Sequence, residues 1–454
     1  MNTRLIAATS TALVVVAVTG CSAGGLSSGS GSGSSKTVTV AYQKYGQFTQ
    51  MDTLMQSVKK QYEADHKGIT VKLVPIQAAE ADYYTKLALM NKSASTAPDV
   101  MYEDTFQLKS DVTAGYLAPL DGYVSKWSDW SQFYDNAKQA GVGDDGKTYG
   151  ISLGTDTRAI WYNKQLFQKA GITVPWQPKT WADVLTAAKT IKQKLPGVIP
   201  FNMYSGTAQG EAASMQGLEM LLYGTKDSLY DTASKKWVVG SQGMTDSLQF
   251  VKDIYQGGLG PTPQQGLDKN IGTTIGSEWL PQGKLAMDLD GSWQSGTWIP
   301  SGGTPWPQWN TVMGQAKMPT QDGAAPGATS MSGGWTLAMG SHSANKDAAW
   351  DFMKIALDKK NSQSYALAAS QIAVRKDVAE DPSYQKANPS FEFFSALVPV
   401  THFRPATADY PKISNQLQVA MESVMTGQSS PSAAAAKYDS AVQGIVGADQ
   451  TTKQ

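Results

Sequence analysis

TVTVAY at residues 37–42 alternates Val38 and Val40 with polar neighbours, which is typical of a short β-strand. Alternation returns in ITVKL at residues 69–73, so a second strand is expected there. Between the two, apolar side chains recur at helical spacing before a His66-Lys67-Gly68 stop, at Met51, Leu54, Met55, Val58 and Tyr62. A strand, a helix and a strand within about 40 residues predict a βαβ unit, which requires a parallel sheet and a right-handed crossover.

A binding edge is expected where the strands of this sheet end. A helix is predicted over residues 80–91, and PDVMY at residues 98–102 is a candidate third strand. Ligands of open α/β sheets bind beyond the carboxyl ends of the strands. The candidate ligand-binding residues at this edge are therefore Gln43, Tyr45, Glu103 and Asp104.

The length of the chain predicts two lobes. About 419 of the 454 residues follow the Ser/Gly segment described below, which is too many for one hydrophobic core. Thr180-Trp181-Ala182-Asp183 has the spacing of a capping box and begins a predicted helix. Further amphipathic helices are predicted over residues 242–255, 345–357 and 410–426.

The N-terminus has the pattern of an export signal. Arg4 precedes an apolar segment at residues 5–18, and Thr19-Gly20 places small residues before Cys21, the only cysteine. This arrangement resembles the lipobox of bacterial lipoproteins, whose cysteine is acylated, for example with palmitate, and becomes the mature N-terminus. We expect residues 1–20 to be a signal peptide and Cys21 to anchor the protein on the extracytoplasmic face of the cell membrane. An ordinary signal peptide with a chance cysteine, or a buried thiol, is the alternative.

Residues 21–36 are expected to be a flexible tether behind this anchor. Residues 22–35 contain seven Ser and five Gly, a composition that cannot bury a core. A coil of this length spans roughly 20 Å on average. No later run of the sequence reaches the ~18–20 apolar residues that a membrane-spanning helix needs.

The balance of charge argues against a nucleic-acid partner. Lysine and arginine together number 38 and so do the acidic residues, so the chain has no basic field to attract a polyanion. The three histidines, His66, His342 and His402, are far apart and have no second metal-type ligand at short spacing. We therefore expect neither a metal site nor a cofactor.

GVGDDGKT at residues 141–148 matches the phosphate-binding pattern G-x-x-x-x-G-K-S/T, but its context is wrong. Such a loop leaves a hydrophobic strand and begins a helix, whose N-terminus faces phosphate. Here a polar helix is predicted before the loop and a strand, YGISL, after it. Asp144 and Asp145 would also repel phosphate, and Asp145-Gly146 is a natural turn. The segment is predicted to be a turn that binds no nucleotide.

Tryptophan is concentrated in one part of the chain. Six of the thirteen lie between residues 279 and 335, among many Gly and Pro residues. Aromatic faces on loops suit the CH-lined faces of sugar rings. About half of the six are expected to fill the core, and the candidates for ligand contact are Trp279, Trp293 and Trp335.

The chain resembles the carbohydrate-type solute-binding proteins of bacterial ABC importers, a family that includes maltose-binding protein, over nearly all of residues 37–440. Each matching segment is short, and their order and spacing together carry the resemblance. The segments are APDV (97–100), AGYLAPLD (114–121), GKTYGI (146–151), WYNKQLF (161–167), AGI (170–172), PKTW (178–181), GKLAM (283–287), GSW (291–293) and GGW (333–335).

The resemblance implies roles for several residues. Trp293 matches a position where the family stacks an aromatic ring on a sugar, and Asp156 lies where relatives carry a ligand-binding acid. Glu103 and Asp104 follow the strand after which relatives place sugar contacts, although Glu103 replaces an aromatic residue of maltose-binding protein, so maltose is not implied. Trp335 lies near a crossing between lobes. A turn or cap for the two aspartates, and a core position for either tryptophan, are the alternatives.

The family architecture implies an α/β fold of two lobes, each with a mainly parallel sheet flanked by helices. The implied lobes are residues 37–153 with 337–375, and residues 157–332 with 380–450, joined by three hinge crossings. Arg404, before Pro405, either contacts ligand or bridges the lobes. Ligand that bridges both lobes favours the closed state.

The expected function is capture of a sugar or short oligosaccharide for a separately encoded ABC permease, by a monomer that is not an enzyme. The rival from another class is an exported glycoside hydrolase, which needs two carboxyl groups about 5–9.5 Å apart. With 38 acidic residues, the sequence always offers such a pair, so it cannot support that reading. A second rival is a binder of another solute, such as a polyol or a peptide. The sequence does not determine which sugar is bound.

Overall fold

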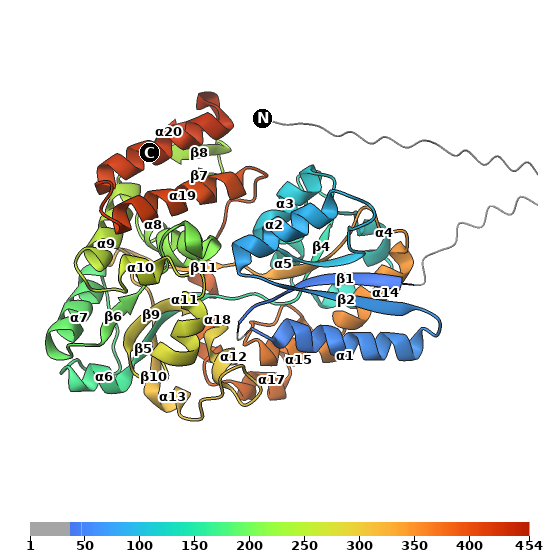
Figure 1. Ribbon diagram of the computed structural model, residues 1–454, viewed down its shortest axis with the longest axis horizontal. Helices are drawn as coiled ribbons and strands as arrows, with labels where there is room; N and C mark the ends of the chain where they lie inside the picture. The colour runs from blue at the N-terminus through green and yellow to red at the C-terminus, as the bar shows by residue number, and fades with distance from the viewer. Residues whose placement is uncertain (1–36, 47, 454) are drawn as a thin grey trace, which may run out of the picture. The chain divides into compact units, whose positions relative to one another are not determined.

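The computed structural model describes residues 37–46 and 48–453, so the predicted signal peptide, Cys21 and the tether lie outside the described residues. These described residues form one compact unit. Two sheets, each covered by helices, make up most of this unit (Figure 1). The fold is α/β and has two lobes, one around each sheet.

The first sheet has the strand order β2-β1-β3-β12-β4. Strand β1 pairs in parallel with both β2 and β3, and β12 is the strand that runs against its neighbours. The predicted βαβ unit is confirmed. The elements are β1 (Thr37–Lys44), α1 (Gln50–Asp65), β2 (Thr70–Gln77), α2 (Glu80–Asn91), β3 (Val100–Asp104), β4 (Gly150–Ser152) and β12 (Trp335–Met339).

Alternation along β1 distributes its side chains over two cores. Val38, Val40 and Tyr42 pack with α1, together with α14 (Lys346–Ala356) and α15 (Lys359–Ala368). Ala41 packs on the other face, with Tyr83 of α2 and with α3 (Thr105–Thr113). Helices therefore cover both faces of the sheet (Figure 1). A sheet covered on both sides leaves its strand ends as the place for a ligand.

The second sheet has the order β10-β5-β9-β6, and β5 is the strand that runs against the others. Thr180 caps α7 through the predicted capping box with Asp183. The predicted helices at residues 242–255 and 410–426 are also present. The elements are β5 (Arg158–Asn163), β6 (Ile199–Asn202), β9 (Leu285–Gly291), β10 (Met313–Ala316), α7 (Trp181–Lys194), α9 (Gln242–Tyr255), α19 (Tyr410–Met425) and α20 (Pro431–Val446).

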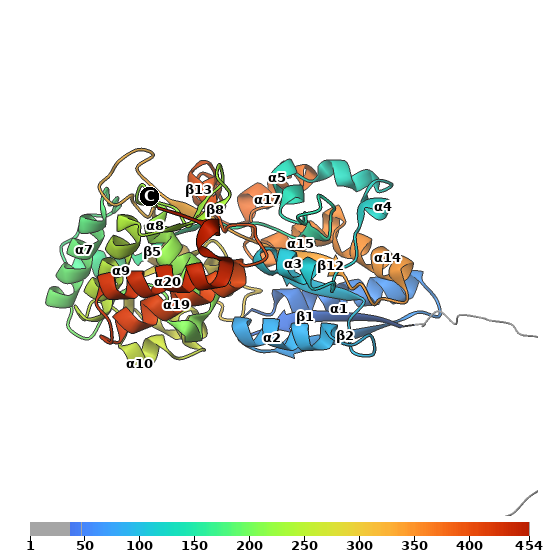
Figure 2. The same ribbon diagram turned by 90° about the horizontal axis from the view of Figure 1, so that it is seen from above.

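Two small sheets and a set of short helices complete the unit (Figure 2). The small sheets are β11 (Ser330–Ser332) with β13 (Thr401–Phe403), and β14 (Thr451–Lys453) with β8 (Lys236–Val239) and β7 (Tyr230–Asp231). The short helices are α4 (Asp121–Val124), α5 (Asp135–Gln139), α6 (Lys164–Lys169), α8 (Met220–Leu222), α10 (Pro263–Gly266), α11 (Ile271–Thr274), α12 (Gln294–Trp298), α13 (Trp309–Val312), α16 (Lys376–Ala379), α17 (Pro382–Ala387) and α18 (Phe391–Ser395). The short 3-10 and π-helical segments are η1 (Ser128–Gln132), η2 (Thr207–Gln209), η3 (Ala212–Glu219), η4 (Ile275–Trp279), η5 (Val398–Val400) and η6 (Ala448–Gln450).

The chain passes between the two sheets three times, between β4 and β5, between β11 and β12, and after α15. Thr155 of the first passage and Ile372 of the third exchange backbone hydrogen bonds of 3.0 and 2.8 Å. The hydroxyl of Thr155 also donates to the carbonyl of Gly333 in the second passage, at 2.9 Å. The three passages therefore lie side by side.

The residues around and after the third passage pack in two groups. Ala366, Val378 and Phe391 belong to one small core, whereas Ile372, Phe394 and Leu397 pack with the second lobe. The predicted lobe limits remain predictions.

Residues 141–148 form a turn before β4 rather than a phosphate loop before a helix. Gly143 donates its N–H to the carbonyl of Lys147 at 2.9 Å, and Val142 pairs with Thr148 across the turn. The Lys147 ammonium lies 3.4 Å from the Asp145 carboxylate. The predicted turn is confirmed. Among the residues that the structure describes, no helix has the length and apolar content to span a membrane.

Candidate functional site

A cavity of about 290 Å³ lies where the two lobes meet. The first lobe lines it with the carboxyl ends of β1 and β3 and with the start of β12. The second lobe lines it with the start of β5, the end of β9 and the segment around η2 and η3. The lining residues used below are Gln43, Tyr45, Glu80, Asp82, Tyr102, Asp104, Asp156, Arg158, Tyr204, Glu211, Lys269, Asp290, Trp293, Trp335 and Arg404.

Seven of the nine predicted site residues line this cavity, and three of them, Gln43, Tyr45 and Asp104, follow from the rule for strand ends. They are Gln43, Tyr45, Asp104, Asp156, Trp293, Trp335 and Arg404. The Gln43 amide donates to the carbonyl of Ala78 at 3.0 Å, and the Tyr45 hydroxyl donates to the carbonyl of Lys269 at 2.5 Å. The second of these contacts joins the two lobes at the edge of the cavity.

Glu103 does not line the cavity, which corrects the expectation for this residue. Successive strand residues point to opposite faces, and Asp104 is the one that faces the cavity. Glu103 is 1 % exposed on the other face of β3. Burial, with the nearby Asp111 carboxyl, raises the pKa of Glu103 well above its ordinary value.

Trp279 does not line the cavity either. It ends the π-helical turn η4 and packs in an apolar cluster with Trp161, Trp298 and Trp309. Three of the six clustered tryptophans, Trp279, Trp298 and Trp309, are therefore buried core residues, as expected for about half of them. Because η4 ends against this apolar cluster, the side chain of Trp279 packs in the core and not in the cavity.

Arg404 joins the two lobes through an ion-pair cluster in the cavity wall. Its guanidinium lies 2.6 Å from the carboxylate of Asp104, at the end of β3, and 3.2 Å from that of Glu211, before η3. It also lies 4.7 Å from the centre of the Phe106 ring. Of the two roles left open by the sequence, the structure shows that of a bridge, because Asp104 and Glu211 belong to different lobes.

Glu80 adds a further carboxyl group to this cluster. The Tyr84 hydroxyl donates to Glu80 at 2.6 Å and to Asp104 at 3.3 Å. Burial, together with the negative charge of Asp104, raises the pKa of Glu80 to about 7. Burial also raises the pKa of Glu211, and the neighbouring Arg404 opposes that rise. The carboxyl groups here outnumber the single guanidinium.

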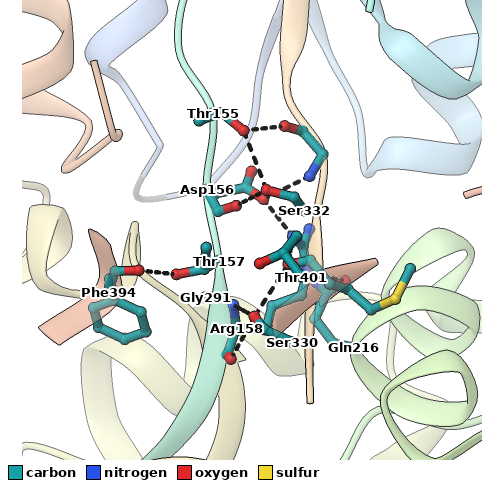
Figure 3. Close-up of polar contacts among 12 residues, drawn as sticks. Thr155, Asp156, Thr157, Arg158, Gln216, Gly291, Ser330, Ser332, Phe394 and Thr401 are labelled. Atoms are coloured by element: carbon teal, nitrogen blue, oxygen red, sulfur yellow. Dashed lines mark hydrogen bonds and ion pairs between the residues drawn. The ribbon is translucent and has the colours of Figure 1, made fainter. Parts of the chain in front are cut away.

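Asp156 and Arg158 form a second ion pair, at the passage between the lobes (Figure 3). The N–H of Gly333 donates to the Asp156 carboxylate at 3.0 Å, and Arg158 donates to the carbonyl of Met331 at 3.1 Å. Ser332 donates to the Asp156 carbonyl. The pair therefore holds the first and second passages together and borders the cavity at the same time.

Asp290 lies beside this pair at the end of β9. It accepts hydrogen bonds from the Tyr204 hydroxyl at 3.1 Å and from the N–H of Gly291 at 2.8 Å. Burial raises the pKa of Asp290 to about 6, although the hydrogen bond from Gly291 opposes the rise. Asp290 and Glu80 thus bring carboxyl groups with raised pKa values from the two lobes.

Trp293 and Trp335 present their rings to the cavity in different ways. The Arg158 guanidinium lies 4.7 Å from the centre of the Trp293 ring. A side chain at Gly291 would meet that ring, because a Cβ there would come within 1.9 Å of it. Trp335 instead stacks on Tyr102, with ring centres 4.3 Å apart and planes 9° apart. Both rings therefore line the cavity while each packs on a protein group, Trp293 on Arg158 and Trp335 on Tyr102.

The edge of the cavity is crossed by an exposed ion pair. The Lys269 ammonium of the second lobe lies 3.1 Å from the Asp82 carboxylate of the first, and both side chains are about half exposed. A Cβ on Gly46 would come within 2.3 Å of the Thr273 hydroxyl, so the lobes approach closely here. The structure thus shows the lobes in contact around the cavity.

Several lining residues escaped the sequence analysis, chiefly Glu80, Asp82, Arg158, Tyr204, Glu211, Lys269 and Asp290. For Asp290 a signal existed. It lies near the end of LAMDLDG, an apolar strand, and the rule for strand ends applies to it as it does to Asp104. Glu211 and Lys269 lie on connecting segments, where no local pattern marks them. Within the described residues, no group of three or more acidic or histidine side chains has the geometry of a metal site.

Comparison with known proteins gives a consistent picture. Residues 45–363 match the family described as bacterial extracellular solute-binding protein. A binding protein of Brucella abortus is 27 % identical over 391 residues, which are 85 % of this chain and 88 % of that protein. The galactooligosaccharide-binding protein of Bacillus subtilis is 23 % identical over 403 residues, which are 87 % of this chain and 88 % of that protein.

A solved structure shows the same fold over nearly the whole chain. The GacH receptor of Streptomyces glaucescens, determined without ligand and with acarbose, is 26 % identical. The similarity covers 90 % of this chain and 98 % of that protein, with a TM-score of 0.75.

Proposed function

The chain belongs to the family of bacterial extracellular solute-binding proteins, and we propose that it binds a sugar or short oligosaccharide in the cavity between its lobes and delivers it to an ABC-type permease. The observation that carries the proposal is the lining of the cavity, which combines the ring of Trp293 with the carboxyl groups of Asp156 and Asp290. Carboxylates accept strong hydrogen bonds from sugar hydroxyls, and an aromatic face covers the CH side of a sugar ring.

The relatives support the same reading. The Bacillus subtilis relative is a galactooligosaccharide-binding protein, and the Streptomyces glaucescens receptor was solved with acarbose. The proteins that the chain resembles are binding proteins, so no residue of the cavity needs a catalytic role. A sugar that contacts both lobes binds the closed form better than an open one, so it would stabilise the closed form. The ion pair of Arg404 with Asp104 joins the lobes in the same arrangement.

A thermal-shift screen against monosaccharides and oligosaccharides tests this proposal. A ligand present at 100 times its dissociation constant stabilises the folded state by about 2.7 kcal/mol, which gives a clear rise in melting temperature. A panel of polyols, amino acids and short peptides serves as the control. Binding in the control panel alone would assign the cavity to another kind of solute.

The family places the protein on the extracytoplasmic side, and we propose in addition that Cys21 anchors it to the membrane there. The support is the sequence Val18-Thr19-Gly20-Cys21 after an apolar segment. Two acyl chains on one residue hold a protein stably, whereas one chain gives only marginal binding. The Ser/Gly tether would leave the lobes free to turn.

Substitution of the cysteine tests the anchor. Cys21→Ser is expected to move the protein from the membrane fraction to the soluble fraction or medium, without a change in sugar affinity. Ser22→Ala, one residue further on, is the matched control and is expected to stay in the membrane fraction. Retention of Cys21→Ser in the membrane fraction would refute the anchor.

A further inference from the structure

Each basic side chain that lines the cavity already has an acidic partner. Arg158 pairs with Asp156, Arg404 pairs with Asp104 and Glu211, and Lys269 pairs with Asp82 at 3.1 Å. Arg158, Lys269 and Arg404 are the basic residues in the described lining of the cavity. A negatively charged ligand would therefore find no unpaired cation.

Two more carboxyl groups face the cavity. Glu80 and Asp290 make no ion pair within the part of the chain that the structure describes, and their partners are the hydroxyls of Tyr84 and Tyr204 and the N–H of Gly291. They come from different lobes, so they flank a bound ligand on two sides. Both sit among other acidic residues, and these like charges repel an added anion.

Protonation does not reverse this conclusion. If Glu80 and Asp290 both hold a proton, their negative charge is gone, but all three basic side chains keep their acidic partners. An anion in the cavity would lose its hydration without gaining a counter-charge, which is costly. If it took Arg158 from Asp156, it would leave that buried aspartate unpaired instead.

An uncharged sugar meets none of these costs. Its hydroxyls donate to the carboxylates, and hydrogen bonds to an ionised acceptor are stronger than those between neutral groups. The ring of Trp293, which lines the cavity, supplies an apolar surface for the sugar. From these observations, and resting on the proposed function, we infer that the cavity selects sugars without phosphate or carboxylate groups, and that Glu80 and Asp290 act as a charge filter against sugar phosphates and sugar acids.

Binding to matched sugars of different charge tests the inference. The probes are glucose, galactose and mannose and their disaccharides, each beside its 6-phosphate and its uronic acid, with affinities measured by calorimetry. The anionic member of each set is expected to bind at least about tenfold more weakly than the neutral member, which corresponds to about 1.4 kcal/mol. An anionic sugar that binds as tightly as its neutral counterpart would overturn the inference and leave sugar binding intact. If no sugar of any charge binds, the proposed function and the inference both fail.

Two variants test whether Glu80 and Asp290 cause this discrimination against anionic sugars. Glu80→Gln combined with Asp290→Asn keeps the shapes of the side chains and removes their charges. This double variant is expected to reduce the ratio of the affinities for neutral and anionic sugars at least about threefold, or about 0.65 kcal/mol. The matched control, Glu380→Gln with Glu392→Gln, removes two exposed charges away from the cavity and is expected to leave the gap unchanged. Since Asp290 is buried, Glu80→Gln alone serves if the double variant does not fold. A folded variant with an unchanged gap would overturn the role of these residues.

Discussion

At the scale of single residues, five of the six tryptophans between positions 279 and 335 fall into two groups. Trp279, Trp298 and Trp309 are buried in one apolar cluster, whereas Trp293 and Trp335 line the cavity. Tryptophan therefore contributes stability where it packs in the apolar cluster, and a surface for ligand where it lines the cavity. Substitution of one member of each group separates the two contributions.

Trp293→Ala is expected to weaken sugar binding by about 1.5–3 kcal/mol, the value of one large buried apolar side chain. The melting temperature without ligand should change little, because the ring is only partly buried in the ligand-free cavity. Calorimetric titration with a sugar found in the screen measures the first effect. A large loss of ligand-free stability with unchanged affinity would place Trp293 in the core.

Trp279→Ala is the matched comparison and should show the opposite result. Truncation of a buried tryptophan costs about 3–5 kcal/mol of stability, through lost contacts and the cavity left behind. The folded fraction should keep the affinity of the parent protein, because Trp279 does not line the cavity. Chemical denaturation and calorimetry on the same sample would show both results, and weaker sugar binding by a stable variant would contradict this placement.

At the scale of elements, a buried polar network joins η3 to α19. The Tyr410 hydroxyl donates to Glu219 at 2.6 Å, and the hydroxyls of Ser214 and Ser414 lie 2.6 Å apart. Burial raises the pKa of Glu219 to about 8, while the hydrogen bond from Tyr410 opposes the rise. The helix pair that positions Glu211 beside Arg404 thus contains a carboxyl group that prefers its proton.

Stability of the ligand-free protein should therefore fall as the pH rises from about 5 to about 8. Glu219 binds its proton more tightly in the folded state than in the unfolded chain, where its pKa is near 4.5. Its contribution is complete below that unfolded pKa and is lost as the pH rises through about 8. Glu80, whose pKa burial raises to about 7, acts in the same direction.

Glu219→Gln should reduce this fall, and denaturant unfolding at several pH values would measure it. Burial lowers the pKa of His402, so its contribution is present above its unfolded pKa and is lost as the pH falls. Because the parent and the variant both contain His402, the difference between them reports Glu219. Equal pH dependence in the two proteins would show that Glu219 does not hold a proton in the fold.

At the scale of the whole molecule, two ion pairs join the lobes in different surroundings. Arg404 is nearly fully buried between Asp104 and Glu211, whereas the pair of Lys269 and Asp82 is about half exposed to solvent. Loss of one partner of a buried pair leaves an uncompensated charge, but an exposed pair contributes little. The buried cluster should therefore dominate the contact between the lobes.

Arg404→Gln is expected to cost about 3–5 kcal/mol of stability, because it strands two buried carboxylates. It should also open the lobes, which small-angle scattering would detect as a larger radius of gyration. Lys269→Gln should cost no more than about 1 kcal/mol, and the cost should shrink in high salt. A larger effect from Lys269→Gln than from Arg404→Gln would reverse the assignment.

The sequence by itself determined the elements and the family of the fold. Alternation over residues 37–42, the capping box at Thr180 and the turn at Asp145-Gly146 all depend on neighbours a few residues apart, and the structure confirms each of them. The order of the family segments extended this local information to an α/β fold of two lobes. The strand-end rule then placed Gln43, Tyr45 and Asp104 at the cavity, and the family resemblance pointed to Asp156, Trp293 and Trp335.

The tertiary structure alone decided which of those residues act together. Strand alternation separates Glu103 from Asp104 but does not say which face of β3 meets the second lobe. Arg404 lies 300 residues from Asp104 and 193 from Glu211, and no local period connects such positions. Local patterns are set by the geometry of one helix or strand, whereas the charge of the cavity depends on which side chains from distant segments pair with one another after the lobes have packed.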